Sequence, residues 1–166
     1  MVIAAVLSAL GVILLAIGSL FQVLDLSMAV IASLLVIFSV IELGGKYPYL
    51  IYAVTALLSV LLVPAKTAAM VYLCFAGYYP ILKAKLEGAL SPAVAWPLKI
   101  LIFNAGFAVA LFASVKLFTA LVLPSTWYLW LIPAGTLVFV IYDVALTRLI
   151  TAYLTRWRHR FTFLHK

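Results

Sequence analysis

The side chains that could bind a ligand are few in this chain, because charged residues make up 9% of its 166 residues. The main candidates fall near the ends of apolar segments, and they are Gln22, Asp25, Lys66, Lys116, Trp127 and Tyr128. Lys66 and Lys116 could together hold a carboxylate or phosphate, with Asp25 as their counter-ion in the empty site, and Trp127 could cover a flat ring. These residues predict a site for a small anionic or zwitterionic ligand with an aromatic portion. Anchoring of lysines and aromatic residues at a membrane interface would explain the same positions.

A second pair of polar residues lies inside the apolar segments. Asn104 is five residues after Lys99 and Asp143 is five residues before Arg148, so on adjacent antiparallel helices the two should reach a similar depth. A carboxylate within a bilayer is costly unless it is paired, and it is a functional candidate by default. We expect Asp143 to hydrogen-bond with Asn104 or with a tyrosine on another helix. A structural clasp is the favoured role, and proton coupling is the alternative.

Patterns typical of catalysis or metal binding are missing from the sequence. No stretch resembles HExxH, GxSxG, an ATP-binding loop or a pair of carboxylates placed for acid–base chemistry. Cys74 is the single cysteine, and both histidines, His159 and His165, belong to the basic C-terminal tail. The sequence therefore predicts no catalytic residues, no bound metal and no cofactor.

The elements that position these residues can be predicted from composition and from the breaks between apolar runs. Hydrophobic residues make up 69% of the chain and the mean hydropathy is +1.32, whereas soluble domains are about half apolar. Because a bilayer core of about 30 Å needs about 20 apolar residues per helix, the chain can cross a membrane about six times. The breaks place the spans at 2–24, 28–42, 49–63, 67–86, 98–123 and about 127–148. We expect an all-α integral membrane protein with a single six-helix domain over residues 1–155; the continuous apolar runs argue against barrel strands.

The positions of lysine and arginine predict how the chain is oriented. If the N-terminus is cytoplasmic, Lys66 and Lys116 fall outside, and the residues inside are Lys46, Lys83, Lys85, Lys99, Arg148, Arg156, Arg158, Arg160 and Lys166. This positive-inside bias predicts that both termini are cytoplasmic and that the protein lies in the cell membrane. Residues 156–166 are basic and amphipathic, so we expect this tail to lie on the anionic inner leaflet. The net charge of +7 then reflects topology and does not indicate nucleic-acid binding.

Small residues are concentrated in the first span. Ala5 and Ala9 stand four residues apart, and a neighbouring stripe consists of Ala4, Ser8, Gly11 and Gly18. Small residues at this spacing let another helix approach closely in a membrane. Two stripes exceed what one internal neighbour needs, which suggests a partner helix; packing within the bundle is the alternative.

The stretch "CFAGYYPILKAKLEG" predicts a break in the fourth span. Gly77 and Pro80 should kink the helix there, because proline lacks a backbone donor and crowds the preceding turn. Lys83 and Lys85 should reach the inner interface and extend toward water. A tolerated proline beside an aromatic anchor is one reading of this stretch, and a bend that moves during function is the other.

Three stretches carry a resemblance to a known family: "AAVLSAL" in the first span, "LDLSMAVIASLLVIF" leading the second, and "ELGGKYP" after it. With its six predicted helices and both ends inside, the chain is similar to the S components of energy-coupling factor transporters, membrane subunits that bind vitamins or related micronutrients from outside. The similarity covers roughly residues 1–90, and the later part matches in helix count and topology. It implies an outward pocket lined by loops one, three and five. It also implies that Ala5 and Ala9 contact a transmembrane coupling subunit and that partner ATPases supply the energy.

Three functions from different classes are compatible with these observations. The favoured one is the substrate-binding membrane subunit of a micronutrient uptake transporter, and the first alternative is a cell-envelope scaffold that holds partners without a ligand pocket. A membrane enzyme is third, because the sequence shows no catalytic groups for it. An outer cavity would distinguish the first from the others.

Overall fold

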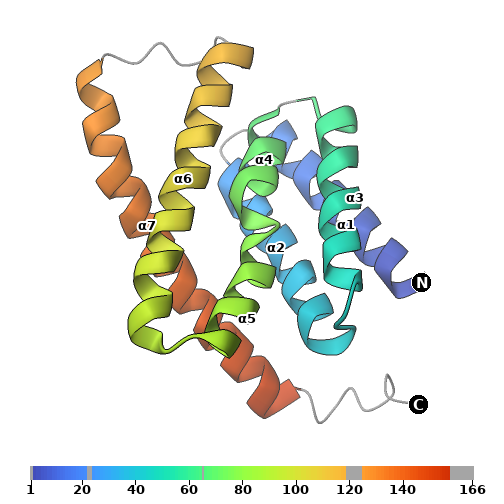
Figure 1. Ribbon diagram of the computed structural model, residues 1–166. Helices are drawn as coiled ribbons and strands as arrows, with labels where there is room; N and C mark the ends of the chain where they lie inside the picture. Colours follow the sequence, from blue (N-terminus) through green and yellow to red (C-terminus); the bar gives the residue numbers. More distant parts are fainter. Residues whose placement is uncertain (1, 22–23, 65, 119–124, 158–166) are drawn as a thin grey trace.

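The computed structural model describes residues 2–21, 24–64, 66–118 and 125–157, without the side chains of 113–118, 125–129 and 157. Over these residues the chain is 91% helix and has no strand, so the predicted all-α class is confirmed. The elements, shown in Figure 1, are α1 (Val2–Leu20), α2 (Asp25–Glu42), α3 (Tyr47–Leu62), α4 (Lys66–Val71), the π-helical turn η1 (Tyr72–Ala76), α5 (Tyr79–Ala89), α6 (Pro92–Phe118), α7 (Ser125–Ala152) and the π-helical turn η2 (Tyr153–Trp157).

Four helices of the described chain, α1, α2, α6 and α7, are long and apolar enough to cross a membrane. The helix α3 is shorter, at 16 residues, and the fourth predicted span is divided into α4, η1 and α5. The structure therefore has the helices of a multi-pass membrane protein. The basic tail predicted for the inner leaflet falls mostly at 158–166, outside the described residues.

The chain turns from α2 into α3 at the predicted Gly-Gly break. Gly44 and Gly45 both adopt positive φ, 59° and 57°, a conformation that costs glycine little and other residues much more. The backbone N–H groups of Leu43 and Gly44 both donate to the Ser39 carbonyl, which closes the end of α2. Pro48 then lies in the first turn of α3, where its missing N–H would have had no helical partner.

One predicted boundary is wrong by several residues. The helix α6 begins at Pro92 and not at residue 98, because the Ser91 carbonyl already accepts the N–H of Ala95 and Pro97 is accommodated inside the helix. The helix α7 runs on to Ala152 and η2 continues it to Trp157, so the helix extends past residue 148, where the sixth predicted apolar span ends.

The break in the fourth span is confirmed, but its geometry differs from the predicted proline kink. Pro80 lies in the first turn of α5, where a proline removes no helical hydrogen bond. The irregular part precedes it, in the π-helical turn η1, where the N–H of Gly77 reaches back five residues to the Tyr72 carbonyl. Such turns insert one extra residue into a helix and often occur at functional sites.

The helix α1 packs closely on α2 and α3 through its glycines. A Cβ atom at Gly11 would lie 2.8 Å from Cγ2 of Thr55, and one at Gly18 would lie 2.8 Å from Cβ of Met28. The stripe that contains Ser8, Gly11 and Gly18 is buried here, so its role is packing within the bundle.

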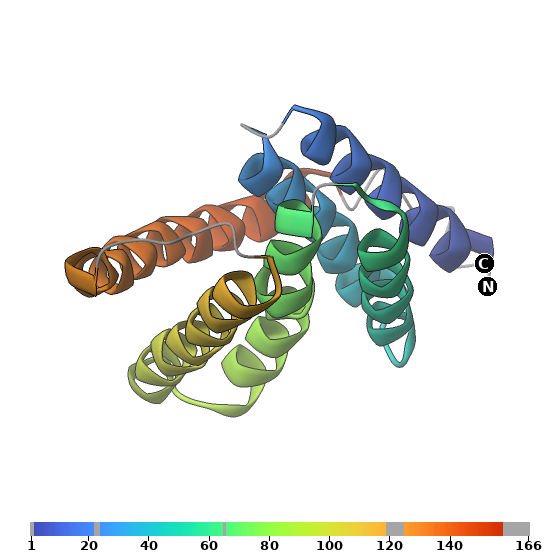
Figure 2. The same cartoon turned by 90° about the horizontal axis from the view of Figure 1, so that it is seen from above.

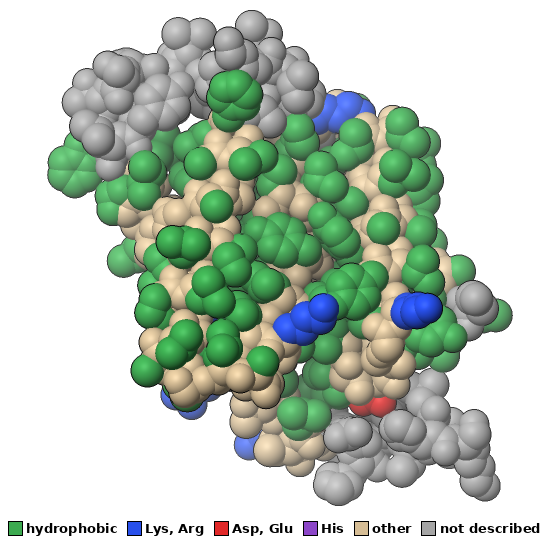
Figure 3. Space-filling model, viewed as in Figure 1, with side chains coloured by type: hydrophobic (Ala, Val, Ile, Leu, Met, Phe, Trp, Pro, Cys, Tyr) green, Lys and Arg blue, Asp and Glu red, His purple; other side chains and the backbone are tan. Residues whose placement is uncertain are grey.

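The helices α6 and α7 diverge from the α1–α3 group, as Figures 1 and 2 show. The helices α6 and α7 are farthest apart at the C-terminal end of α6 and the N-terminal end of α7 (Figure 1). One buried core is shared by α1, α2, α3 and α4. A second, around Tyr79, Phe103 and Phe139, is shared by α2, α5, α6 and α7. Figure 3 shows hydrophobic side chains over most of one face, as expected for a surface against lipid.

Candidate functional site

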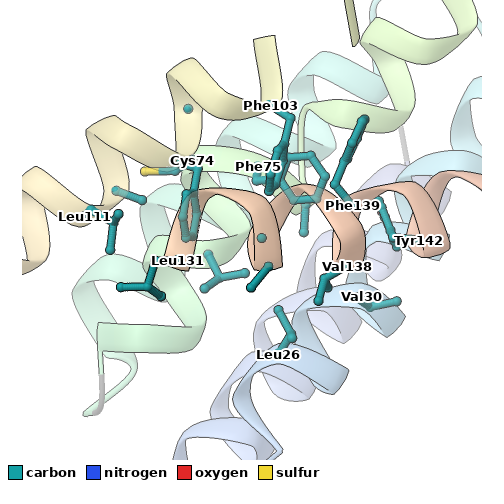
Figure 4. A pocket seen from close by; sticks show the side chains of 17 residues that line it. Leu26, Val30, Cys74, Phe75, Phe103, Leu111, Leu131, Val138, Phe139 and Tyr142 are labelled. Carbon is teal, nitrogen blue, oxygen red and sulfur yellow. The ribbon is translucent and has the colours of Figure 1, made fainter. Parts of the chain in front are cut away.

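A cleft of about 440 Å³ lies between α2, the η1 turn, α6 and α7 (Figure 4). Of the 17 residues that line it, only Cys74 and Tyr142 carry a side-chain heteroatom, and none is charged. Small-molecule sites in proteins usually have volumes of about 300–1,000 Å³. The cleft is therefore large enough for a small organic ligand.

One wall of the cleft is an aromatic cluster that consists of Phe75, Phe103, Phe107 and Phe139. The Phe103 ring is stacked between its neighbours, with centroids 5.6 Å from Phe107 and 4.6 Å from Phe139. Phe75 meets Phe103 edge to face at 4.9 Å, a geometry that aromatic quadrupoles favour. The wall is apolar, and contacts between the rings hold it together.

The η1 turn brings Cys74 and Phe75 to the cleft. The Tyr52 hydroxyl donates a hydrogen bond to the Leu73 carbonyl of this turn at 2.9 Å. Gly106 lets α6 approach this turn, because a Cβ there would lie 2.9 Å from the Cys74 carbonyl oxygen. The cleft wall therefore depends on a π-helical turn and on a glycine that faces it.

Buried charges lie directly behind the aromatic wall. The Tyr79 ring packs on Phe139 with centroids 5.2 Å apart, and the Tyr79 hydroxyl donates a hydrogen bond to the Asp143 carboxylate. The Lys83 Nζ lies 2.5 Å from Oδ1 of Asp143, and the Lys99 Nζ lies 3.3 Å from Oδ2. Asp143 thus accepts hydrogen bonds from α5 and α6 while it sits on α7.

Glu87 completes this charge network, which we define as Lys83, Glu87, Lys99 and Asp143. Its Oε1 lies 2.7 Å from the Lys83 Nζ and 2.5 Å from the Lys99 Nζ. Both lysine side chains and that of Asp143 are 2% exposed, whereas that of Glu87 is 44% exposed. Two cations face two carboxylates, so the network has no net charge.

The expected pair of Asn104 and Asp143 does not form. The Asn104 amide donates to the Ile100 carbonyl at 2.9 Å, and its Oδ1 accepts from the Thr136 hydroxyl at 3.3 Å. Asp143 binds Tyr79 instead, which is the tyrosine alternative, together with two lysines. The physical reason is that a carboxylate in a low-dielectric interior is stabilised far more by ammonium groups than by a neutral amide.

Lys83 and Lys85, which the sequence predicts to extend toward water, have different surroundings in the structure. Lys83 was expected to extend toward water, yet it is buried and paired. Lys85 is exposed, and its Nζ lies 5.1 Å from the centroid of the Tyr49 ring. The spacing of Lys83 and Glu87, an i,i+4 pair, was the available signal for a local ion pair, but it did not identify Asp143 as a partner.

The residues predicted to bind an anionic ligand do not line the cleft where the structure describes them. The Lys66 Nζ donates to the carbonyls of Val60 and Val63, both at 2.7 Å, and so caps the end of α3. Asp25 is buried at the start of α2, and its Oδ1 has no hydrogen-bond partner among the described residues. The other predicted residues lie outside the description: all of Gln22, and the side chains of Lys116, Trp127 and Tyr128.

The two stripes of α1 face different surroundings. Ala5 and Ala9 are exposed on the outside of the bundle, beside the exposed side chains of Val6 and Leu10. Because Gly11 and Gly18 already serve α2 and α3, the Ala5–Ala9 face is free for lipid or another helix.

The site could bind a ligand through shape complementarity and apolar contacts. The charge network behind the aromatic wall has no net charge. Within the part of the chain that the structure describes, no three His, Cys, Asp or Glu side chains come together as a metal-binding group. Comparison of the chain with protein-family models, with curated proteins and with solved structures found no match.

Proposed function

We propose that this protein is the substrate-binding membrane subunit of an uptake transporter of the energy-coupling factor type, and that the cleft holds its ligand. The observation that supports this proposal is the cleft itself, a concave site of about 440 Å³ built from both halves of the chain. A scaffold without a ligand would have no need for it. The resemblance of residues 1–90 to S components supplies the transport class.

The proposal includes the topology and the partners. In it the chain crosses the cell membrane six times with both termini in the cytoplasm, and α3 and the α4–η1–α5 segment complete the bundle. Ala5 and Ala9 contact a coupling subunit, and partner ATPases drive release of the ligand. Reporter fusions at each terminus test the orientation; a terminus outside the cell would contradict it.

The experiment for the cleft compares two substitutions on the same helix. Ala134 lines the cleft and Ala145 is exposed elsewhere on α7, so Ala134→Phe fills the site and Ala145→Phe is the matched control. Native mass spectrometry of the purified proteins should find a small molecule retained by the parent chain and by Ala145→Phe, and lost from Ala134→Phe. Equal retention by both variants would contradict the proposed site.

The cell-envelope scaffold stays as a second candidate because the Ala5–Ala9 face of α1 is free. Substitution of Ala9 by phenylalanine should remove a coupling subunit that copurifies with the parent chain. If partners are lost with Ala9→Phe and the parent chain retains no small molecule, the scaffold is the better account.

A further inference from the structure

The ligand class can be inferred from the chemistry of the cleft, on the basis of the function proposed above. We infer that the cleft takes an uncharged, largely apolar molecule rather than the anionic or zwitterionic ligand expected from the lysines. This conclusion depends on which groups face the cleft, which charges are already neutralised, and which surface the cleft opens to.

The described lining of the cleft offers a charged ligand no charged partner. Ser33 Oγ donates to the Val30 carbonyl at 2.6 Å, so in its 2.8 Å hydrogen bond with Tyr142 the tyrosine hydroxyl is the donor. The Tyr142 hydroxyl proton is therefore used within the protein. The Cys74 thiol, a weak donor, is the remaining side-chain donor of the described lining. A charged group buried without a partner is strongly disfavoured, which excludes anions and cations from this part of the site.

The nearest buried charges cannot serve a ligand either. Tyr79, which is 1% exposed, separates Asp143 from the cleft, and the charge network is neutral within itself. A ligand anion would have to take Lys83 or Lys99 away from its carboxylates. Each lysine already pairs with both Glu87 and Asp143. A lysine that moved to a ligand anion would give up these two ion pairs for one.

The shape and the rim of the cleft favour the same class. The stacked rings of Phe107, Phe103 and Phe139 form an apolar wall suited to flat rings or branched hydrocarbon. At the rim, Leu26 of α2 and Val138 of α7 remain 52% and 49% exposed, on helices apolar enough to cross the bilayer. An apolar molecule dissolved among acyl chains can therefore reach the cleft.

The test uses two probes with the same ring skeleton and different charge. N-phenyl-1-naphthylamine is uncharged, and 1-anilinonaphthalene-8-sulfonate adds one sulfonate. Binding of each is measured by energy transfer from tryptophan, with the protein in nanodiscs. Saturable binding of the uncharged probe is expected, at least about 30-fold tighter than that of the sulfonate, because burial of an unpaired polar group costs about 2 kcal/mol or more.

Matched variants assign the signal to the cleft. Ala134→Phe should weaken the uncharged probe at least tenfold while Ala145→Phe leaves it unchanged. If Ala134→Phe does not give a monodisperse protein, Val30→Phe replaces it, with the exposed neighbour Ile31→Phe as its control. Equal binding of the two probes, or tighter binding of the sulfonate, overturns the inference.

Native mass spectrometry separates a wrong ligand class from a wrong function. A charged small molecule that Ala134→Phe loses overturns the inference and leaves the proposed transport function standing. A bulk phospholipid lost in the same way overturns the inference too, because it identifies the cleft as a lipid contact. If no molecule is retained and neither probe responds to Ala134→Phe, the inference and the proposed function both fall.

Discussion

Removing the charge of Asp143 should destabilise the protein where α5, α6 and α7 pack together. Asparagine has nearly the same shape as aspartate, so Asp143→Asn deletes the charge and leaves the space filled. The carboxylate is 2% exposed and lies 2.5 Å from the Lys83 Nζ and 3.3 Å from the Lys99 Nζ. In the variant two buried ammonium groups would have only Glu87 as a carboxylate partner.

The loss of this carboxylate partner sets the expected decrease in the free energy of unfolding. Removal of one partner from a buried ion pair costs about 3–5 kcal/mol. Glu87 still contacts both lysines, so the lower end, about 3 kcal/mol, applies here. For a chain of this size, each kcal/mol shifts the melting temperature by about 2–4 °C, which gives a decrease of about 6–12 °C.

Thermal unfolding of the purified protein in detergent is the assay. Thr151 is exposed on the same helix and its hydroxyl donates to the Thr147 carbonyl of its own helix, so Thr151→Ala is the control and should change stability by less than about 0.5 kcal/mol. The double variant Asp143→Asn, Lys83→Met removes one charge of each sign and should recover most of the lost stability.

Two outcomes would refute this reasoning. One is a decrease below about 3 °C for Asp143→Asn, because it would mean that the lysines find water or other partners at little cost. The other is a double variant no more stable than the single one, because the penalty would then not come from the unpaired charge of Lys83.

Two further predictions concern packing and hydrogen bonding in the bundle. Gly11→Ala should destabilise the protein by about 1–3 kcal/mol in thermal unfolding, because its Cβ would meet Cγ2 of Thr55 at 2.8 Å. Gly88→Ala should instead stabilise it by about 0.5–1 kcal/mol, since a Cβ at this helical glycine meets no atom within 4 Å; equal effects of the two would contradict the close approach. Tyr142→Phe and Ser33→Ala should each cost about 0.5–1.5 kcal/mol through their shared 2.8 Å hydrogen bond. The double variant should cost clearly less than the sum, and strict additivity would show that the two hydroxyls are not coupled.

The sequence alone determined the membrane character and most of the helical elements. The apolar runs are long enough to identify α1, α2, α6 and α7, and the Gly44–Gly45 break between α2 and α3 was also predicted. These features depend on local composition and on residues with special backbone conformations, and both are visible in a single chain.

The tertiary structure alone decided which apolar and charged residues face one another. A bilayer is as apolar as a protein core, so hydrophobic periodicity cannot separate Phe139, which lines the cleft, from Leu137, which is 64% exposed. Likewise, Lys83 and Asp143 are 60 residues apart, and only the packing of α5 against α7 brings their charges within 2.5 Å. The cleft and its charge network therefore result from helix packing. The pattern of residue types along the chain did not predict that packing.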